Sequence, residues 1–455
     1  MVHQRINIIE ETDVSVLKES LTFPTTKIVA RNRFLKAAMT EKLCLYEPGN
    51  IKHGVPNQSL INLYERWGNS SYGVILSGNI PVDKNHLEAP GNAIIEKELD
   101  SPERREGFKK MASAGKADGA LFVAQLTHAG RQTPYALNKN PSSASDVHLE
   151  SATRKFMKFA KPVALTIEQI KTEVVDKFAF AAEYCYNAGF DGVQVHGAHG
   201  YLLAQFLSPT TNKRTDKYGG SIENRTRLYV EVYEAIRERV PVETGFIVGV
   251  KLNSVEFQNE GLQTSDAAEA AKIIDKTGYD FIELSGGTYE KYGFDKQRDS
   301  TTRREAFFDV FSKSIKGEVK HAIVYLTGGF RRVSGMVESI QNNVTDGIGL
   351  GRPVASEPSF PKRVLEDNVQ TCAEDYLDNS DFTLSFLASN TQMSQMAKLP
   401  FSECGGDHCK GIMDLSKQEV SEQYMETVFD FLQNTVLKAN PDEPAHFMLH
   451  FDVEE

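Results

Sequence analysis

The sequence predicts an α/β fold, a (β/α)8 TIM barrel followed by a helical C-terminal extension. Eight short apolar runs alternate with helix-like stretches, and polar or glycine residues follow each run. Most of the runs are apolar on both faces, as in a parallel sheet that is covered by helices. An open doubly wound sheet shows the same local pattern, but the number of predicted strands favours the barrel.

The eight predicted strands follow one another at spacings that leave room for crossover helices. Their bounds are Arg33–Met39, Val74–Gly78, Leu121–Thr127, Gly192–Gly197, Ile247–Asn253, Phe281–Gly287, Ile323–Gly329 and Gly347–Pro353.

Two of the predicted crossover helices have clear boundary signals. Thr166 and Gln169 form a capping box, in which each side chain satisfies a free backbone donor, and Asn187-Ala188-Gly189 ends that helix. A second helix is predicted from near Thr264 to Gly278, directly before the sixth strand.

The chain is predicted to divide into a barrel over residues 1–365 and a mainly helical C-terminal extension over residues 366–455. Helices are predicted within the extension at Phe382–Met396 and Gln418–Lys438, and a loop at Asn440–Ala445. The sequence leaves open whether the extension packs on the barrel, covers its mouth or mediates assembly.

Composition narrows the function classes. The formal net charge of −11 argues against a nucleic-acid partner, which needs a basic surface. The chain contains no run of 18 apolar residues, so no membrane-spanning helix is predicted. The first dozen residues lack the pattern of a secretory signal. Five scattered cysteines fit a reducing compartment, so the sequence predicts a cytoplasmic protein.

The strongest candidate site follows the fourth predicted strand. His196 and His199 stand three residues apart, and Tyr201 follows within two residues. Two imidazoles on one loop can bind a single oxygen and polarise a conjugated C=C bond, and a tyrosine can supply the proton. A metal site or two structural histidines are the alternatives, although zinc usually needs a third protein ligand.

The string from Asp191 to Arg225, which contains HGAHGYL, QFLSP and YGGS, closely resembles the Old Yellow Enzyme family of FMN-dependent NADH:flavin oxidoreductases and ene-reductases. The segments Gln125–Arg131, Leu326–Phe330 and Gly349–Pro353 resemble further motifs of that family, in the same order. The resemblance runs from about Asn32 to about Pro358.

This resemblance implies a tightly bound, non-covalent FMN with NAD(P)H as co-substrate. It implies that Gly78 or Asn79 lies near flavin N5, that Gln125 binds the pyrimidine edge, and that Lys251 lies near N1 and O2, where the family commonly has Arg. It places four first-strand residues against the flavin ring, namely Ala37, Ala38 (often Pro in the family), Met39 and Thr40. It places four further residues at the phosphate, namely Gly328, Gly329, Gly351 and Arg352.

Other motifs have plainer interpretations. The GIGLGRP segment lacks the full dinucleotide fingerprint, so a Rossmann interpretation is weak. His128 and Arg131 are expected to support the loop after the third strand, and Glu223, Asn224 and Arg225 to brace the loop after the fourth.

Two loops carry further expectations. Cys404 and Cys409 lack the four-cysteine spacing of an iron–sulfur centre, so we expect a surface turn with incidental thiols, or at most a minor metal loop. No metal ligand is assigned. The loop from Pro134 to Pro162 is either a substrate lid or a solvated loop, with its basic side chains Arg154, Lys155, Lys158 and Lys161.

Taken together, the sequence predicts an enzyme that transfers hydride from NAD(P)H through flavin N5 to the β-carbon of an activated alkene, with Tyr201 as proton donor. The partner is a small α,β-unsaturated carbonyl or nitro compound, and the family resemblance also implies a homo-oligomer. The alternatives are an NAD(P)H oxidase that uses oxygen, or a flavin-binding scaffold without catalysis. The sequence does not choose between NADH and NADPH.

Overall fold

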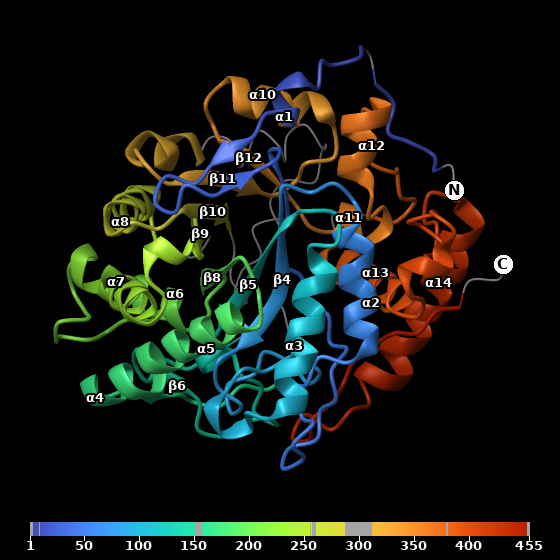
Figure 1. The fold of residues 1–455 in the computed structure, drawn as a ribbon. Helices are drawn as coiled ribbons and strands as arrows, with labels where there is room; N and C mark the ends of the chain where they lie inside the picture. The colour runs from blue at the N-terminus through green and yellow to red at the C-terminus, as the bar shows by residue number, and fades with distance from the viewer. Residues whose placement is uncertain are drawn as a thin grey trace.

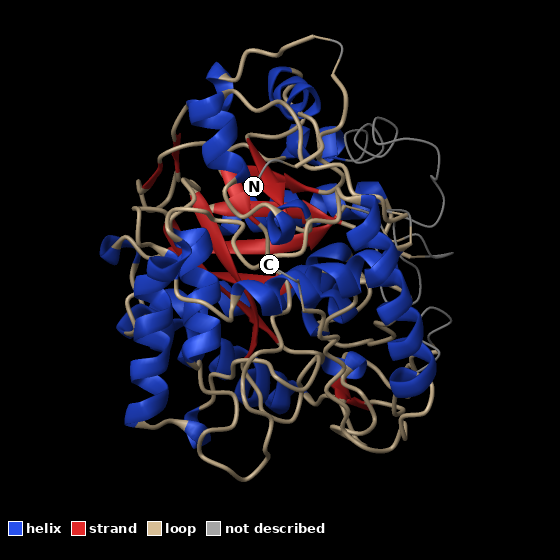
Figure 2. Cartoon of the chain, turned by 90° about the vertical axis from the view of Figure 1, so that its right-hand side faces the viewer, coloured by secondary structure: helices blue, strands red, loops and turns tan. Residues whose placement is uncertain are grey.

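The computed structural model describes residues 3–8, 10–150, 157–254, 256, 261–286, 312–378 and 381–452. Eight parallel strands close into a barrel, with helices around the outside, as Figures 1 and 2 show. This confirms the predicted TIM barrel. In spatial order the strands are β3 (Phe34–Lys36), β4 (Val74–Pro81), β5 (Leu121–Thr127), β8 (Gly192–Gly197), β9 (Ile247–Asn253), β10 (Phe281–Ser285), β11 (Ile323–Thr327) and β12 (Gly347–Leu350).

The predicted strand bounds are accurate in the middle of the barrel and less so at its ends. The third, fourth and fifth predicted strands have the observed bounds of β5, β8 and β9. The first and last are shorter than predicted, because β3 spans only Phe34–Lys36 and Pro353 begins a helix. Gly287, the predicted end of the sixth strand, lies outside the described residues.

The helices that surround the barrel follow the strands in the expected alternation. The Thr166 capping box is present and starts α4 (Ile167–Gln169), which continues through a π-helical turn (Ile170–Val175) into α5. Other helices up to residue 367 include α1 (Ser15–Lys18), α2 (Gln58–Gly68), α3 (Pro102–Gly115), α5 (Asp176–Asn187), α6 (Leu202–Leu207), α7 (Ile222–Arg239), α8 (Thr264–Thr277), α10 (Val333–Gln341), α11 (Pro353–Ser356) and α12 (Phe360–Asp367), and residues 312–318 are also helical.

The interior of the barrel changes from apolar to polar along the strands. Side chains from the first residues of the strands form a closed apolar cluster at the N-terminal end, with Val74, Ile247 and Phe281 among its members. Nearer the C-terminal ends the inward side chains are polar, and they include Gln194 and Glu283. Because chemistry sits at the C-terminal end of such barrels, this polarity points to the mouth as the site.

The C-terminal extension packs beside α2 and α11 (Figure 1). Helix α13 (Phe382–Met396) has the predicted bounds, whereas the second predicted helix is α14 (Gln418–Phe431) followed by a π-helical turn (Leu432–Val436).

The N-terminal segment lies against the extension. His3 Nδ1 lies 2.9 Å from Asp414 Oδ1, and the backbone N–H of Gln4 donates to Ser416 Oγ at 3.0 Å. Residues from the two ends of the sequence are therefore neighbours in space.

The Cys404–Cys409 segment corrects one expectation. Both thiols are buried, and burial raises the pKa of Cys409 to about 12. The cysteines therefore face the interior and are not incidental surface groups. Among the described residues, no helix has the length and apolar character needed to cross a membrane.

Candidate active site

Three aromatic side chains converge where β8 ends. His196 is the penultimate residue of β8, His199 lies in the following turn, and Tyr201 caps the N-terminus of α6. The ring centroid of His196 lies 5.3 Å from that of His199 and 4.5 Å from that of Tyr201. His199 has a φ of +57°, a left-handed conformation that lets the short turn bring both imidazoles to one place.

Hydrogen bonds orient both imidazoles. The backbone N–H of Ala198 donates to His196 Nδ1 at 3.3 Å, so a neutral His196 carries its proton on Nε2. His199 Nε2 lies 2.9 Å from Ser285 Oγ, and its backbone N–H donates to Asn253 Oδ1 at 3.1 Å. Ser285 and Asn253 were not predicted as site residues, although both end strands of the barrel.

Burial keeps the two imidazoles neutral. Desolvation lowers the pKa of His196 well below its usual value, and the neighbouring His199 and Lys251 lower it further. Burial and then the charge of Lys251 lower the pKa of His199 to about 3. At pH 7 both rings are therefore neutral hydrogen-bonding groups.

The floor of the mouth is a chain of polar side chains from five strands. Gln125 Nε2 donates to Gln194 Oε1 at 2.7 Å, and Gln194 Nε2 donates to Glu283 Oε2 at 2.7 Å. The other oxygen of Glu283 accepts from Lys251 Nζ at 2.9 Å and from Thr327 Oγ1 at 2.6 Å. The structure thus brings together Gln125 and Lys251, which were predicted from distant segments.

Gln194 and Glu283 were not among the predicted site residues, although the sequence contains a signal for both. Each is a polar residue inside a run that is otherwise apolar. Strand alternation places them inward, in register with Gln125 and Lys251 on the neighbouring strands. Glu283 is fully buried, and it balances the charge of Lys251.

The ends of β3 and β4 supply a second polar group. The Thr40 hydroxyl donates to Asn79 Oδ1 or to Glu88 Oε2, which lie 2.9 and 3.0 Å away. The backbone N–H of Gly78 instead faces Tyr64 Oη, at 2.7 Å, on the helix side of the strand. Of the two alternatives at the end of β4, Asn79 is therefore the one beside Thr40.

The other predicted first-strand residues divide between the two ends of β3. Ala37 is buried and continues the ladder by donating its N–H to the Leu350 carbonyl at 2.8 Å, while Ala38 and Met39 are half-buried. Asn32 and Arg33 lie at the opposite end of the strand, where Asn32 Nδ2 donates to the Ser71 carbonyl at 2.7 Å.

The predicted phosphate residues directly follow two adjacent strands, β11 and β12. Gly329 has a φ of +78°, which favours glycine. A Cβ atom on Gly351 would meet no atom within 4 Å, so the space beside it is open. Arg352 is half-buried and donates from Nη1 to Ser385 Oγ of α13.

The chain matches a known protein family. The family model of the NADH:flavin oxidoreductase / NADH oxidase family matches residues 22–370. The chain belongs to this family. It is 41% identical over 391 residues to the NADH-dependent flavin oxidoreductase nadA of Aspergillus parasiticus, which is 85% of this chain and 87% of the relative. It is 33% identical to the NADH-dependent flavin oxidoreductase iccE of Talaromyces variabilis, over 73% of this chain and 83% of that protein.

Solved structures of this family share the barrel. Morphinone reductase in complex with tetrahydroNAD superposes with a TM-score of 0.61 at 23% identity, over 79% of this chain and 92% of that one. The Old Yellow Enzyme homologue from Zymomonas mobilis gives 0.61 at 24% identity, over 78% and 94%. The predicted Old Yellow Enzyme membership is confirmed, and the chain is an NAD(P)H-dependent flavin oxidoreductase with FMN as cofactor.

The residues present fit a flavin of this family. Asn79 Nδ2 is buried without a hydrogen-bond partner among the described residues, and it lies beside the Thr40 hydroxyl. The Gln125 amide and the Lys251 ammonium offer the donors that a pyrimidine edge requires. Open space at Gly351 suits the close approach of a phosphate to the backbone.

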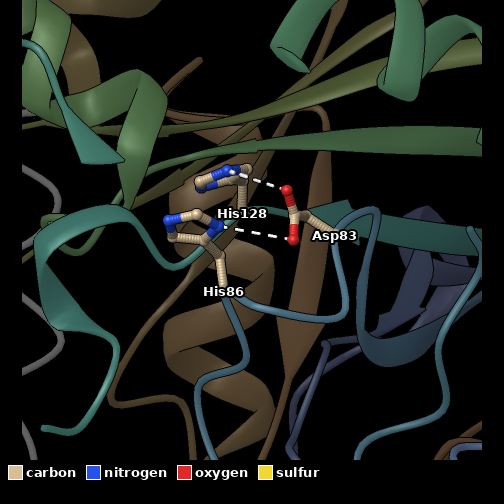
Figure 3. A group of neighbouring side chains, drawn as sticks. All are labelled: Asp83, His86 and His128. Carbon is tan, nitrogen blue, oxygen red and sulfur yellow. Dashed lines mark ion pairs between the residues drawn. The ribbon is translucent and has the colours of Figure 1, made fainter. Parts of the chain in front are cut away.

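A third cluster, of Asp83, His86 and His128, is buried among residues that follow β4 and β5 (Figure 3). The two imidazoles stack with centroids 4.1 Å apart, and Asp83 Oδ1 lies 3.4 Å from His86 Nδ1. Backbone N–H groups donate to His86 Nε2 at 2.9 Å and to His128 Nδ1 at 3.1 Å. Each neutral ring therefore carries its proton on the nitrogen that faces Asp83.

This cluster fits a structural role better than a metal site. A metal ligand needs a lone pair on the nitrogen that here carries the proton. Lys177 Nζ already lies 2.7 Å from Asp83 Oδ2. Burial raises the pKa of Asp83, but His86, His128 and Lys177 outweigh burial and hold that pKa below its usual value.

The remaining predicted residues make structural contacts. Arg131 Nη1 donates to the Val147 and His148 carbonyls, and Arg225 donates to the Gly220 carbonyl and to Asp266. Asn224 Nδ2 donates to the Gly219 carbonyl at 3.0 Å, and Glu223 lies in the first turn of α7. In the predicted lid loop, the Lys158 ammonium pairs with Asp442 and that of Lys161 with Asp146, while Arg154 and Lys155 lie outside the described residues.

Proposed function

We propose that this protein reduces the C=C bond of activated alkenes, such as α,β-unsaturated carbonyl or nitro compounds. The observation that carries the proposal is the convergence of His196, His199 and Tyr201 at the end of β8. Two neutral hydrogen-bond donors can bind a carbonyl oxygen, and a phenol can protonate a carbon.

When bound, FMN supplies hydride that derives from NAD(P)H and passes from flavin N5 to the alkene β-carbon. The activating oxygen of the alkene accepts a hydrogen bond from His196 Nε2, because Nδ1 of that ring is occupied by the Ala198 N–H. A Ser285 hydroxyl that donates to His199 Nε2 leaves the His199 proton on Nδ1, available to the same oxygen.

Two neutral donors are well suited to this role. They withdraw electron density from the β-carbon without presenting a permanent charge that would hold the product. Lys251, the nearest cation, is paired with Glu283, so it does not compete for the oxygen.

Tyr201 supplies the proton in this proposal. Its side chain is buried and its ring lies edge-on to that of His196, so the phenol stands beside the bound oxygen and the adjacent α-carbon. The Tyr201 Oη proton passes to the α-carbon, and water restores it after product leaves.

An anaerobic absorbance experiment tests the proposal. The FMN-loaded protein is titrated with NADH or NADPH and then with 2-cyclohexenone. We expect the flavin band to bleach with the nicotinamide and to return with the enone. Return of the band only when air is admitted would refute alkene reduction and favour an oxidase.

A further inference from the structure

The C-terminal extension builds one wall of an apolar pocket beside the candidate active site. The pocket holds about 1130 Å³ of space, part of it open to solvent. The family model ends at residue 370, so this wall lies outside the residues that the model matches. Apolar side chains of the extension line it, and they are Phe386, Leu387, Phe431, Leu432, Val436 and Phe447.

Loops of the barrel form the facing wall. Lys42 and Ala89 follow β3 and β4, and Pro134, Ala136 and Met157 belong to the segment after β5. All of these loops leave the C-terminal ends of strands, the end at which chemistry occurs in this fold. The pocket is therefore at the mouth of the barrel.

Two contacts join the pocket to the candidate active site. Glu88 lines the pocket, and Glu88 Oε2 lies 3.0 Å from the Thr40 hydroxyl. Met157 also lines the pocket, and it packs on the small apolar cluster that contains Tyr201 and Phe159. The pocket thus borders the site on the Thr40 side and on the Tyr201 side.

Hydrogen bonds connect the C-terminal extension to the mouth of the barrel. Asn390 Nδ2 of α13 donates to the Thr40 carbonyl at 2.8 Å, and His446 Nε2 donates to the Lys42 carbonyl at 2.8 Å. Because these bonds end on the segment that carries Thr40, the pocket has a fixed position relative to the site.

The lining favours an uncharged, ring-bearing ligand. Aromatic and aliphatic side chains dominate the lining, and such surfaces bind apolar groups by removing them from water. The cations that line it are engaged with protein groups, since the Lys42 ammonium lies 5.1 Å from the Phe386 ring centroid and Lys158 pairs with Asp442.

We infer that this pocket binds the apolar body of the alkene substrate while the histidine pair binds its activating oxygen. The inference rests on the proposed alkene reduction, and it names the substrate class as uncharged enones that carry aryl or fused rings. The extension is then the part of the chain that selects the substrate.

Matched variants on α14 and the following turn test the inference. Phe431→Ala and Leu432→Ala remove pocket-lining groups, whereas Phe429→Ala and Leu437→Ala make the same changes at positions that are 67% and 65% exposed and do not line the pocket. Ala136→Phe fills the pocket from the barrel side and leaves the extension intact. Melting temperature monitors folding of each variant.

Binding is measured first, by calorimetry of the FMN-loaded protein with dihydrochalcone, a saturated aryl ketone that cannot be reduced at a C=C bond. We expect the wild type, Phe429→Ala and Leu437→Ala to bind it alike, and Phe431→Ala, Leu432→Ala and Ala136→Phe to bind it at least about tenfold more weakly. Equal binding by all six proteins, or none by the wild type, would overturn the inference.

Turnover is then measured with chalcone and with 2-cyclohexenone. We expect the pocket variants to lose kcat/KM for chalcone at least about tenfold and to keep that for cyclohexenone. Equal losses with both substrates would overturn the inference, because the extension would then act on the whole site. Selective dihydrochalcone binding with no turnover of either enone by any protein would refute the proposed function and leave the pocket assignment standing.

Discussion

The two ends of the barrel interior contain opposite kinds of side chain. At the N-terminal end Val74, Ile247 and Phe281 pack into an apolar cluster, whereas at the C-terminal end Lys251 and Glu283 form a buried ion pair. The first arrangement gains free energy by removing apolar surface from water, and the second costs desolvation that its own hydrogen bonds must offset. The same strands therefore contribute apolar packing at one end and the polar groups of the candidate site at the other.

The largest expected effect of a single change lies at the polar end. Tyr201→Phe removes the proposed proton donor and keeps the ring that packs on His196. We expect enone turnover to fall about 10²–10⁴-fold, the usual contribution of a general acid. Stopped-flow absorbance should show flavin reduction by NADH at the wild-type rate and slow reoxidation by cyclohexenone. Unchanged reoxidation would remove Tyr201 from the proton-transfer step.

The corresponding change at the apolar end should lower the stability of the fold and leave the candidate active site unchanged. Phe281 is fully buried, with its ring centroid 5.8 Å from those of Phe23 and Tyr325. Phe281→Ala should lower the free energy of unfolding by about 3–5 kcal/mol, as for other large core truncations. Denaturant unfolding measures this loss, and FMN affinity of the folded variant is the control. A large loss of FMN affinity with little loss of stability would contradict the division between the two ends.

Glu283→Gln changes the charge at the polar end with little change in the size of the side chain. Lys251 then loses its counter-charge, so an uncompensated cation would lie at the pyrimidine edge proposed for the flavin. We expect the FMN midpoint potential to rise by at least about 30 mV, which corresponds to about 1.4 kcal/mol for a two-electron couple. Thr327→Val is the matched control, since it removes a neutral donor to the same carboxylate oxygen. An equal shift in both variants would show that charge is not the cause.

The polar end should also give stability a pH dependence that the apolar end lacks. His199 has a folded-state pKa of about 3, set by burial and Lys251, against about 6.5 in an unfolded chain. Between these values the unfolded state binds the extra proton, so the free energy of unfolding falls as pH drops from about 6.5 towards 3, by at most about 1.4 kcal/mol per pH unit.

His199→Asn should make this pH dependence shallower in urea titrations between pH 4 and 7. Phe281→Ala should keep the wild-type slope at a lower absolute stability. The same slope in wild type and His199→Asn would show that this imidazole is protonated equally in both states.

The sequence predicted more of the barrel than of the site, and the reason is physical. Strands such as Leu121–Thr127 are apolar on both faces and bounded by polar residues, so their pattern alone gives their bounds. Residues such as Gln125 and Lys251 were found because they lie in motifs of a recognisable family. Glu283, the partner of Lys251, was not, because a polar residue in an apolar run does not by itself show which residue on another strand it bonds to.

The extension shows the other limit of sequence analysis. Its helix α13 was predicted with the observed bounds, yet nothing in the sequence says that Asn390 reaches the Thr40 carbonyl. Packing of one segment on another depends on tertiary geometry, and single-sequence periodicity does not contain it. The π-helical turn after α14 was likewise absent from the prediction.

The contacts of the N-terminal segment set a time order on folding. His3 and Gln4 bond to residues that follow them by 411 and 412 positions. At a synthesis rate of about 5–20 residues per second, roughly 20 to 80 seconds pass before those partners exist. The N-terminal residues therefore dock only after residue 416 has been made, and the entropic cost of closing so long a loop grows only with the logarithm of its length.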